Sequence, residues 1–442
     1  MKIIFIQPSV GRKEGKKYLK TWQMEPLSIA QLSGLTPQNV EKQFFDDRIE
    51  EIDYTQKADL VAISVETYTA KRAYQIADKF KKKGSLIIIG GLHATLVTEE
   101  VVQHADAVIV GEAEGVWKDL LKDVANKKLK KIYKSPERPD LTGLMPDRTI
   151  YQGKKYLPIS LIETGRGCKF KCNFCSVSAF YNQSYNPRPV NDVISEIKSL
   201  KQKIFFIVDD NIGADPIRFK NFLRKIATLK VKWFGQVSIN VLSDKETVEL
   251  MKKSGCAGVL IGFESLDESN LKQIGKDTNS SVKYEKILDN VTNNGISIYA
   301  TFVFGYDNDN SELFQKTYEF AMRQKFFLTA FNHLMPYPGT PLYFQLEKEK
   351  RLLYDKWWLS DTYLFGDLVF KPKNCSPQEI SEACLGLRKK FYSLDSIIKR
   401  INLKTNFQDP LTAMIYLWLN LLFRKEVTER KGLPLGKNDH QG

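Results

Sequence analysis

The sequence predicts an α/β protein with two successive parallel-sheet domains and a mainly helical C-terminal region. Apolar runs of strand length alternate with amphipathic stretches over residues 1–130, and the alternation starts again at residue 157. Strands that are apolar throughout are typical of parallel sheets, whose two faces are covered by the connecting helices. A chain of 442 residues is long enough for two or three such domains.

The first domain, expected over residues 1–130, contains five strand-like runs separated by helical stretches. The runs are KIIFIQP, QFFDD, ADLVAISV, SLIIIGG and ADAVIVGE. Their order predicts a doubly wound, Rossmann-like sheet, in which ligands bind beyond the carboxyl ends of the strands. The segments at those ends are DDR at 46–48, SVETY at 64–68, GGLHAT at 90–95 and GEAEG at 111–115. Because no G-x-G-x-x-G follows a strand, the domain is not predicted to bind a dinucleotide.

Residues 131–156 are basic, contain three prolines and lack periodicity, so we expect a linker there. Six strand-like runs follow within 157–345, from LPISLIETG to FFLTAFNHLMP. Six strand–helix units are too few for a closed eight-stranded barrel, and they predict an open, partial (β/α)6 TIM-like barrel. Residues 346–442 are expected to form helices that cover the mouth of this barrel.

Three of the six cysteines lie in one short segment, GRGCKFKCNFC at 165–175. The other three, Cys256, Cys375 and Cys384, lie far along the chain and do not complete a four-ligand zinc site. Thiolates with the spacing C-x3-C-x2-C can bind three irons of a 4Fe–4S cluster and leave the fourth iron open. The predicted cluster ligands are Cys168, Cys172 and Cys175, and the preceding GRG allows a tight turn.

This motif, with an aromatic residue before its third cysteine and a barrel strand before its first, resembles that of the radical S-adenosylmethionine enzymes. The resemblance covers about 157–345 and implies that the open iron binds S-adenosylmethionine, whose reductive cleavage yields a 5′-deoxyadenosyl radical. It also implies a reducing partner such as flavodoxin or ferredoxin. The residues that it places near S-adenosylmethionine are Phe174, Asp209, Asp210, Ser238 and Glu264. From the residues alone, DDNIGAD at 209–215 is equally an N-cap segment for a helix.

The first domain resembles the cobalamin-binding domains that precede some radical barrels. The resemblance implies that cobalamin contacts a set of residues at the strand ends: Asp46, Ser64, Thr67, Tyr68, Gly90, Gly91, His93, Gly111 and Glu112. One departure is that the Asp-x-His-x-x-Gly motif, whose histidine coordinates cobalt in other cobalamin proteins, is absent. His93 is instead expected to contact the corrin or its tail. Retention of cobalamin without a catalytic role, or its loss, is the alternative.

The two-domain order resembles the class of cobalamin-dependent radical enzymes that includes hopanoid methylases and bacteriochlorophyll-pathway enzymes. The resemblance implies a C-methyltransferase that acts on an unactivated carbon. The aromatic segment at 354–370 and the apolar stretch at 410–424 favour a lipid-like, isoprenoid or tetrapyrrole substrate. A ring-forming, rearranging or oxidising enzyme of the same architecture is the first alternative, and a non-catalytic iron–sulphur or cobalamin sensor is the second. Tyr337 and His333, at the end of the last strand, are the candidate catalytic residues, although a lone histidine is more often structural.

The net charge of +14 comes from lysines scattered along the chain. It indicates a solvated surface and no nucleic-acid partner. No segment reaches the roughly 18 apolar residues of a membrane span, and the sequence predicts a cytoplasmic protein. The apolar stretch 410–427 predicts a buried helix or, alternatively, a helix at the inner membrane face, a peripheral contact. The aromatic segment 354–370 predicts either a small core or an apolar wall of the substrate site.

Overall fold

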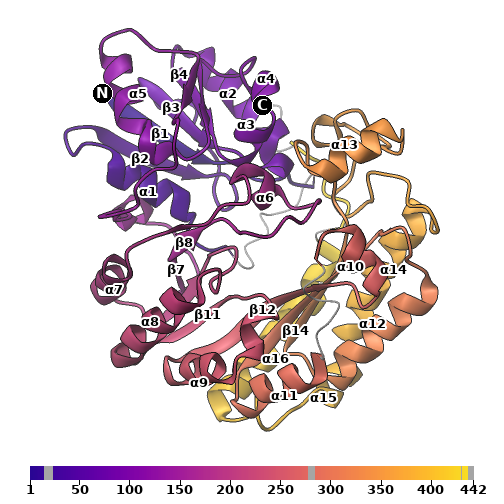
Figure 1. Cartoon of the computed structure of the whole chain (residues 1–442). Helices are drawn as coiled ribbons and strands as arrows, with labels where there is room; N and C mark the ends of the chain where they lie inside the picture. Colours follow the sequence, from indigo (N-terminus) through magenta and orange to yellow (C-terminus); the bar gives the residue numbers. More distant parts are fainter. Residues whose placement is uncertain (14–22, 277–283, 430, 437–442) are drawn as a thin grey trace.

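The computed structural model describes residues 1–13, 23–276, 284–429 and 431–436. Within them, two six-stranded parallel sheets lie one after the other along the chain. Figure 1 shows the first sheet with its helices in the upper part of the view and the second sheet below it. The C-terminal segments return along the second sheet and reach the first domain. This arrangement confirms the predicted α/β class.

The N-terminal sheet has the strand order β2-β1-β3-β4-β5-β6. Its strands are β1 (Lys2–Gln7), β2 (Glu41–Asp46), β3 (Leu60–Ser64), β4 (Leu86–Gly90), β5 (Ala107–Val110) and β6 (Ile132–Lys134). Its helices are α1 (Leu27–Leu35), α2 (Ala70–Lys81), α3 (Leu92–Leu96), α4 (Thr98–Val101) and α5 (Trp117–Ala125). Alternate residues of β1 enter two separate apolar cores, Ile3 and Phe5 on one face and Ile4 and Ile6 on the other. The sheet is therefore covered on both faces, as the apolar runs predicted.

Part of the segment expected as a linker is an edge strand of this sheet. In β6, Ile132 pairs with Val108 and Lys134 pairs with Val110 in parallel register. The strand is only three residues long, and its Ile132 side chain is exposed, so its sequence shows neither an apolar run nor a clear alternation. An edge strand of this kind carries no periodic signal.

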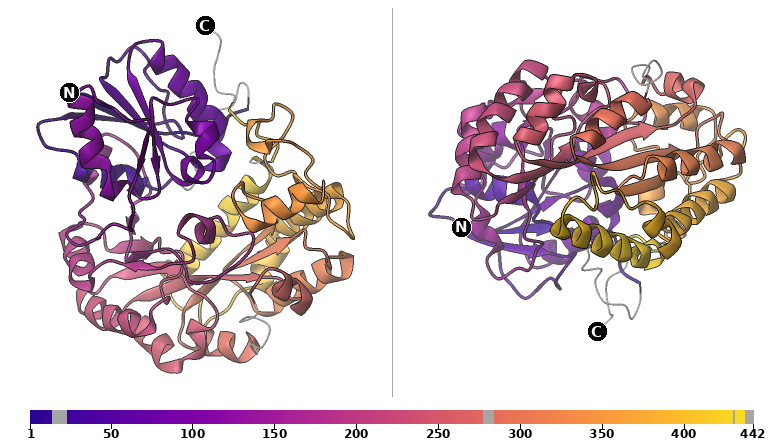
Figure 2. Two further views of the ribbon diagram at one scale, coloured as in Figure 1. Left: turned by 45° about the horizontal axis from the view of Figure 1, so that its top comes forward. Right: turned by 90° about the horizontal axis from the view of Figure 1, so that it is seen from below.

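The second sheet has the order β14-β13-β12-β11-β10-β7 and confirms the open, partial barrel of six strands. Its strands are β7 (Ser160–Ile162), β10 (Ile204–Ile207), β11 (Lys232–Gln236), β12 (Cys256–Glu264), β13 (Ser297–Phe304) and β14 (Leu328–His333). Figure 2 shows the helices on the outer side of this curved sheet. They are α7 (Val190–Ser199), α8 (Pro216–Ile226), α9 (Lys245–Lys253), α10 (Glu268–Gln273), α11 (Tyr284–Asn293) and α12 (Ser311–Arg323).

The C-terminal region is mainly helical, as predicted. It contains α13 (Pro341–Lys348), α14 (Pro377–Phe391), α15 (Leu394–Lys399) and α16 (Pro410–Glu429). No helix of the described chain is long and apolar enough to cross a membrane. In α16, Tyr416 and Asn420 are buried against the barrel, whereas a second face of apolar side chains is exposed. The helix is therefore only half buried.

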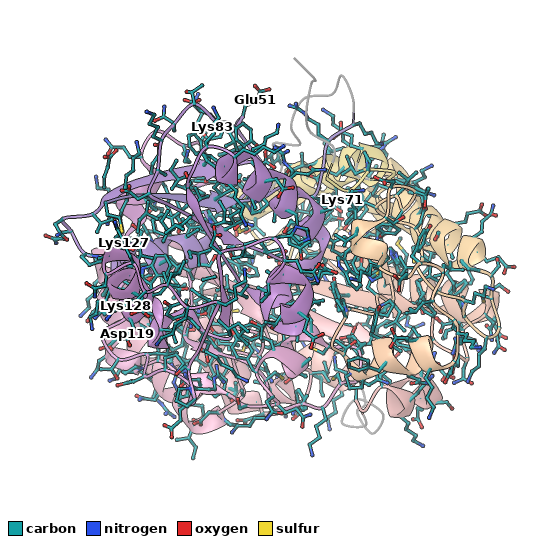
Figure 3. All side chains as sticks on the ribbon, turned by 90° about the horizontal axis from the view of Figure 1, so that it is seen from above. Glu51, Lys71, Lys83, Asp119, Lys127 and Lys128 are labelled. Carbon is teal, nitrogen blue, oxygen red and sulfur yellow. The ribbon has the colours of Figure 1, made fainter. Side chains whose placement is uncertain are left out.

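The aromatic segment between α13 and α14 packs mainly against the N-terminal domain. Trp357, Trp358 and Tyr363 are at most 1% exposed and belong to the core that also contains α2. Lys71 of α2 forms an ion pair with Asp361 at 2.6 Å, and Figure 3 shows Lys71 at the border between the two regions. The small-core interpretation thus holds for the two tryptophans. Phe365, by contrast, lines a cavity.

The lysines labelled on the N-terminal domain do not form one patch. Figure 3 shows Lys83 apart from Lys127 and Lys128, with the acidic side chains of Glu51 and Asp119 on the same face. The Lys122 ammonium lies 3.1 Å from the Asp119 carboxylate, so cations alternate with acids on this surface. The arrangement agrees with a solvated, mixed-charge surface.

Candidate active site between the two domains

The cysteine loop begins and ends on a short antiparallel ribbon. Strand β8 (Gly165–Arg166) pairs with β9 (Asn186–Pro187), and the loop and α6 (Ser176–Phe180) lie between them. In Figure 1, α6 lies between the N-terminal domain and the barrel. Gly167 has φ +85°, and a Cβ atom there would lie 2.2 Å from the Ser184 carbonyl oxygen. Only glycine fits this turn, which directly precedes Cys168.

The three motif cysteines fit a cluster with three thiolate ligands. All three are free thiols, Cys168 buried and the other two half-buried. Burial raises the pKa of Cys168 and raises that of Cys172 to about 12, and both thiols also interact electrostatically with Cys175. Among the described residues, no three His, Cys, Asp or Glu side chains converge on a site for a single ion. Three thiolates that each bind a different iron of one cluster do not need to converge in that way.

A lysine that the motif does not include lies beside these thiols. The Lys276 ammonium donates to the Gly262 carbonyl at 2.8 Å and to the Glu264 carboxylate at 2.7 Å. Its positive charge opposes the effect of burial on the pKa of Cys172. Glu264, which is predicted to lie near S-adenosylmethionine, ends β12 and has a φ of +64°. Its carboxylate forms the ion pair with Lys276. Lys276 follows the last turn of α10, where a lysine usually marks only a solvated helix end, so the sequence did not single it out.

The two aspartates after β10 hold the base of the cysteine loop. Asp209 accepts hydrogen bonds from the backbone N–H and the hydroxyl of Thr164, both at 2.6 Å. Asp210 accepts from the Gly167 N–H at 2.9 Å. Burial raises the pKa of Asp209 to about 7 and also raises the pKa of Asp210. The cap of α8 is a third aspartate of the same segment, Asp215, which accepts from the Arg218 N–H at 3.0 Å.

Ser238 follows β11 and lies 3.4 Å from the side-chain oxygen of Asn211. Phe174 packs against the barrel core and lines the cavity described below. Their predicted place near S-adenosylmethionine stays a prediction.

Three of the residues predicted to contact cobalamin are engaged within the protein. Asp46 is fully buried and binds Arg48, with a second hydrogen bond from the Tyr156 hydroxyl at 2.8 Å. Glu112 forms ion pairs with Arg138 at 2.7 Å and with Arg166 at 3.2 Å. These carboxylates join parts of the fold, and their predicted contact with cobalamin stays a prediction.

His93 is the third. Its imidazole is fully buried, 3.3 Å from the Glu100 carboxylate and 3.3 Å from the Tyr74 hydroxyl. The Trp358 indole N–H donates to the same carboxylate at 3.0 Å. This network joins α3, α4 and α2 to the aromatic segment. The imidazole is enclosed by these partners, and the predicted contact of His93 with the corrin or its tail stays a prediction.

The other predicted residues of the N-terminal domain lie at the strand ends. Gly91 has φ +106°, and a Cβ atom there would lie 2.8 Å from the Val65 carbonyl, so the backbone itself requires this glycine. Gly111, with φ +82°, has open space around it. Thr67 is buried with a hydroxyl that lacks a hydrogen-bond partner among the described residues. Ser64 and Gly90 end β3 and β4, side by side in the sheet.

Tyr68 of the N-terminal domain lines a cavity of about 400 Å³. Its ring centroid lies 4.9 Å from that of Trp357 and 5.1 Å from that of Phe365. The cavity extends from Tyr68 and Phe174 along β13 and β14 to α14 and α16. Its aromatic lining residues are Tyr68, Phe174, Tyr299, Tyr337, Phe365, Tyr392 and Phe423.

The cavity also contains both candidate catalytic residues. Burial raises the pKa of Tyr337, and the Cys175 thiol adds to this effect, so the phenol lies near the cysteine loop. Burial and the Arg388 cation lower the pKa of His333 to about 4, so its imidazole is neutral at physiological pH. Arg388 on α14 is a lining residue that the sequence did not indicate.

Comparison with known proteins agrees with this geometry. The radical SAM superfamily model matches residues 162–321. The chain is 33% identical to bacteriochlorophyllide d C-12(1)-methyltransferase of Chlorobaculum tepidum, over 89% of this chain and 90% of that protein. It is 30% identical to bacteriochlorophyllide d C-8(2)-methyltransferase of the same organism, over 88% and 92%.

A solved structure shares the fold of both domains. The radical S-adenosylmethionine methyltransferase TsrM from Kitasatospora setae, with cobalamin and a 4Fe–4S cluster bound, matches with a TM-score of 0.66. The match covers 86% of this chain and 84% of that one at 15% identity. The predicted order of a Rossmann-like domain and a radical barrel is therefore confirmed. The chain belongs to the radical S-adenosylmethionine superfamily, in the family that includes the two bacteriochlorophyllide methyltransferases.

Proposed function

We propose that this protein is a cobalamin-dependent radical S-adenosylmethionine C-methyltransferase with a tetrapyrrole substrate. The observation that carries the proposal is that Phe174 of the cysteine loop and Tyr68 of the N-terminal domain line the same cavity. A substrate there contacts the two parts of the protein assigned to the two cofactors. The aromatic walls suit a flat, apolar ring system. The 30–33% identity to two bacteriochlorophyllide methyltransferases supports the substrate class.

Each cofactor is assigned to residues of this chain. Cys168, Cys172 and Cys175 bind the 4Fe–4S cluster, and Phe174, Ser238, Glu264 and the Asp209–Asp210 pair surround S-adenosylmethionine. The strand-end residues Ser64, Thr67, Tyr68, Gly90, Gly91 and Gly111 contact cobalamin. When bound, these groups supply a carbon-centred radical that removes hydrogen and a methyl group for transfer to carbon.

The protein's own residues hold the cysteine loop in position and exclude water from the cavity. Asp210 and Gly167 hold the cysteine loop, and the packed rings of Tyr68 and Tyr337 limit access of water to this end of the cavity. Exclusion of water protects a reactive radical from side reactions. The neutral His333 imidazole can exchange a proton with a substrate group inside the cavity.

The test is anaerobic turnover of the full-length protein, reconstituted with iron, sulphide and cobalamin, on bacteriochlorophyllide d. We expect 5′-deoxyadenosine, S-adenosylhomocysteine and a methylated pigment. Cys172→Ala abolishes 5′-deoxyadenosine, whereas Cys375→Ala, a half-buried cysteine outside the motif, retains it. Formation of 5′-deoxyadenosine with an altered but unmethylated pigment favours the ring-forming or oxidising alternative. If neither product forms on any tetrapyrrole tested, the enzyme proposal is wrong and the sensor alternative is favoured.

We also propose that an acidic electron carrier such as flavodoxin or ferredoxin docks on the cysteine loop. Lys169 and Lys171 are exposed between the cluster cysteines. Opposite charge at such a surface accelerates association. Substitution of both lysines by glutamate lowers the rate of 5′-deoxyadenosine formation with flavodoxin but not with dithionite. An equal loss with both reductants contradicts the docking site.

A peripheral contact with an anionic membrane is proposed for α15 and α16. Eight large apolar side chains on this surface are exposed, from Leu417 at 39% to Leu403 at 76%. They are Leu394, Ile398, Leu403, Leu411, Met414, Leu417, Trp418 and Leu421. Exposed cations, including Lys404 and Arg424, lie among them, and the chain carries a net charge of +14. An interfacial helix combines these two features.

Flotation with vesicles tests this contact. The protein should float with vesicles of equal parts phosphatidylcholine and phosphatidylglycerol, and Leu421→Glu should reduce the bound fraction. Ile217→Glu, at an exposed apolar residue of α8 on the barrel, is the matched control and leaves it unchanged. Binding that is equal for both variants contradicts the proposal. A second copy of the chain on the same surface would appear as a dimer in solution.

A further inference from the structure

Arg388 places a guanidinium in the wall of the cavity. Its Nε donates to the Phe331 carbonyl at 2.8 Å and its Nη2 donates to the side-chain oxygen of Asn332 at 2.8 Å. Both acceptors lie on β14, so the planar group is fixed in orientation. In the part of the chain that the structure describes, Nη1 makes no hydrogen bond, and no carboxylate lies within ion-pair distance of this arginine. A guanidinium without an anion in a half-enclosed site is unusual, because its charge is then only partly compensated.

The neighbouring groups leave room for an acceptor. The buried Nε2 atom of His333 and the hydroxyl of Thr329 have no hydrogen-bond partner among the described residues. Buried polar atoms normally have partners, so these two atoms are available to hydrogen-bond a group bound in the cavity. Lys431 adds a second cation to the lining, and Glu426 is the one acidic lining residue of the described chain. The lining therefore has more positive than negative charge.

Most of the remaining lining is apolar or aromatic, with Asn332 and Ser381 as further polar residues. Tyr68 and Phe174 lie at the end near the cysteine loop, whereas Arg388 reaches the cavity from α14, on the β14 side. We propose that the cavity takes a flat apolar molecule that carries a free carboxylate, and that Arg388 binds this carboxylate. His333 and Thr329 complete its hydrogen bonds. The inference rests on the proposed function and restricts its substrate class to tetrapyrrole acids as opposed to their esters.

A pair of pigments that differ only in this group tests the inference. Pheophorbide a is a chlorin with a free propionate, and its methyl ester removes the charge without changing the ring. Titration of each into the full-length, cluster-reconstituted protein, followed by quenching of tryptophan fluorescence, yields two Kd values. We expect the acid to bind at least about tenfold more tightly than the ester, since hydrogen bonds to a charged partner have this effect.

The matched variants are Arg388→Gln and Lys389→Gln. Lys389 is the next residue of α14, carries the same charge and is exposed, and it does not line the cavity. Arg388→Gln should bind acid and ester equally, and Lys389→Gln should keep the wild-type preference. Arg388→Lys, which keeps the charge but loses the planar fork, should show an intermediate preference.

Four outcomes overturn the inference. One is a preference for the acid that persists in Arg388→Gln. Another is a loss of this preference in Lys389→Gln that equals the loss in Arg388→Gln. If Arg388→Gln does not fold, the wild-type comparison decides, and equal affinity for acid and ester contradicts the role of Arg388. That result leaves the proposed function standing, because the chlorin still binds. Binding of neither pigment contradicts the tetrapyrrole substrate and this inference together.

Discussion

Arg166 and Glu114 form an ion pair of 2.7 Å that joins the cysteine loop to the N-terminal domain. Arg166 lies two residues before the first cluster cysteine, and both side chains are largely buried. The same guanidinium also binds Glu112 at 3.2 Å and Glu163 at 2.8 Å. Burial lowers the pKa of Arg166, but Glu163 and Glu114 outweigh this effect and raise it above its usual value. The position of the loop thus depends on acids of the neighbouring domain.

Arg166→Gln should destabilise the protein strongly. The substitution leaves Glu114 and Glu163 buried without this cation, which costs about 3–5 kcal/mol for a buried pair that is broken from one side. Urea unfolding measures the change. Arg224→Gln, which removes an arginine that is 56% exposed, is the control and should change stability by less than about 1 kcal/mol. Equal effects of the two variants would show that the Arg166 network contributes little.

Gly167→Ala should prevent assembly of the cluster. The new methyl group would overlap the Ser184 carbonyl at 2.2 Å, and the φ of +85° is strained for alanine. Iron and sulphide bound per chain after reconstitution measure the effect. Gly153→Ala is the matched control, since Gly153 has φ +81° but nothing within 4 Å of its Cβ position. A normal iron content in Gly167→Ala would mean that the ribbon can shift to admit the methyl group.

Asp209 should make stability fall as the pH rises. Burial raises its pKa in the folded protein from 3.8 to about 7, so the folded state binds a proton that the unfolded chain releases. This contribution is fully present below about pH 4 and is lost as the pH approaches about 7, with a size on the order of 4 kcal/mol. Unfolding of the cluster-free protein by urea at several pH values should show that Asp209→Asn removes this part of the slope.

The control for this measurement is Asp140→Asn. Asp140 is exposed, and hydrogen bonds from Thr142 lower its pKa, so it does not titrate between pH 4 and pH 7. Its substitution should leave the slope in that window unchanged. A wild-type slope that persists in Asp209→Asn would assign it to other buried acids, such as Glu163.

Trp358→Ala should loosen the contact between the aromatic segment and the N-terminal domain. The indole is 1% exposed and donates to Glu100 at 3.0 Å. Loss of a buried tryptophan costs about 3–5 kcal/mol, which urea unfolding would detect. Trp418→Ala, on the exposed face of α16, should change stability by about 0.5 kcal/mol or less. If both variants are equally stable, the buried network around Glu100 does not hold the two regions together.

The fold could be predicted because both sheets consist of buried parallel strands. In β1, β3 and β4 nearly every residue is buried, and such runs are visible in the sequence. Strand β6 could not be predicted, since its outer residues are exposed and its single buried residue, Tyr133, has no periodic neighbours. The half-exposed α16 was ambiguous for a related reason. Its apolar residues occur all around the helix, so the sequence does not distinguish the packed face from the exposed one.

The site could be predicted only where the residues that act together lie in one short segment of the sequence. The three motif cysteines are such a case. His93 could not be placed, because its environment depends on Glu100 and on Trp358, which is 258 residues from Glu100 in the chain. Arg388 lies in the run RKKF at the end of α14, where cations usually stabilise the helix terminus. Only the packing of α14 on β14 distinguishes it from Lys389 and Lys390.

The ion pairs of Arg166 have a consequence for the maturation of the protein. If the chain were divided at residue 156, the N-terminal fragment would contain Glu114 without Arg166 and Glu112 with only Arg138, and the C-terminal fragment would contain Arg166 with only Glu163. In each fragment the charges at this interface would then lack their partners from the other domain. Neither fragment would hold the cysteine loop in place. Docking of the two halves is therefore expected to precede insertion of iron and sulphide, and co-expressed fragments should acquire iron only after they associate.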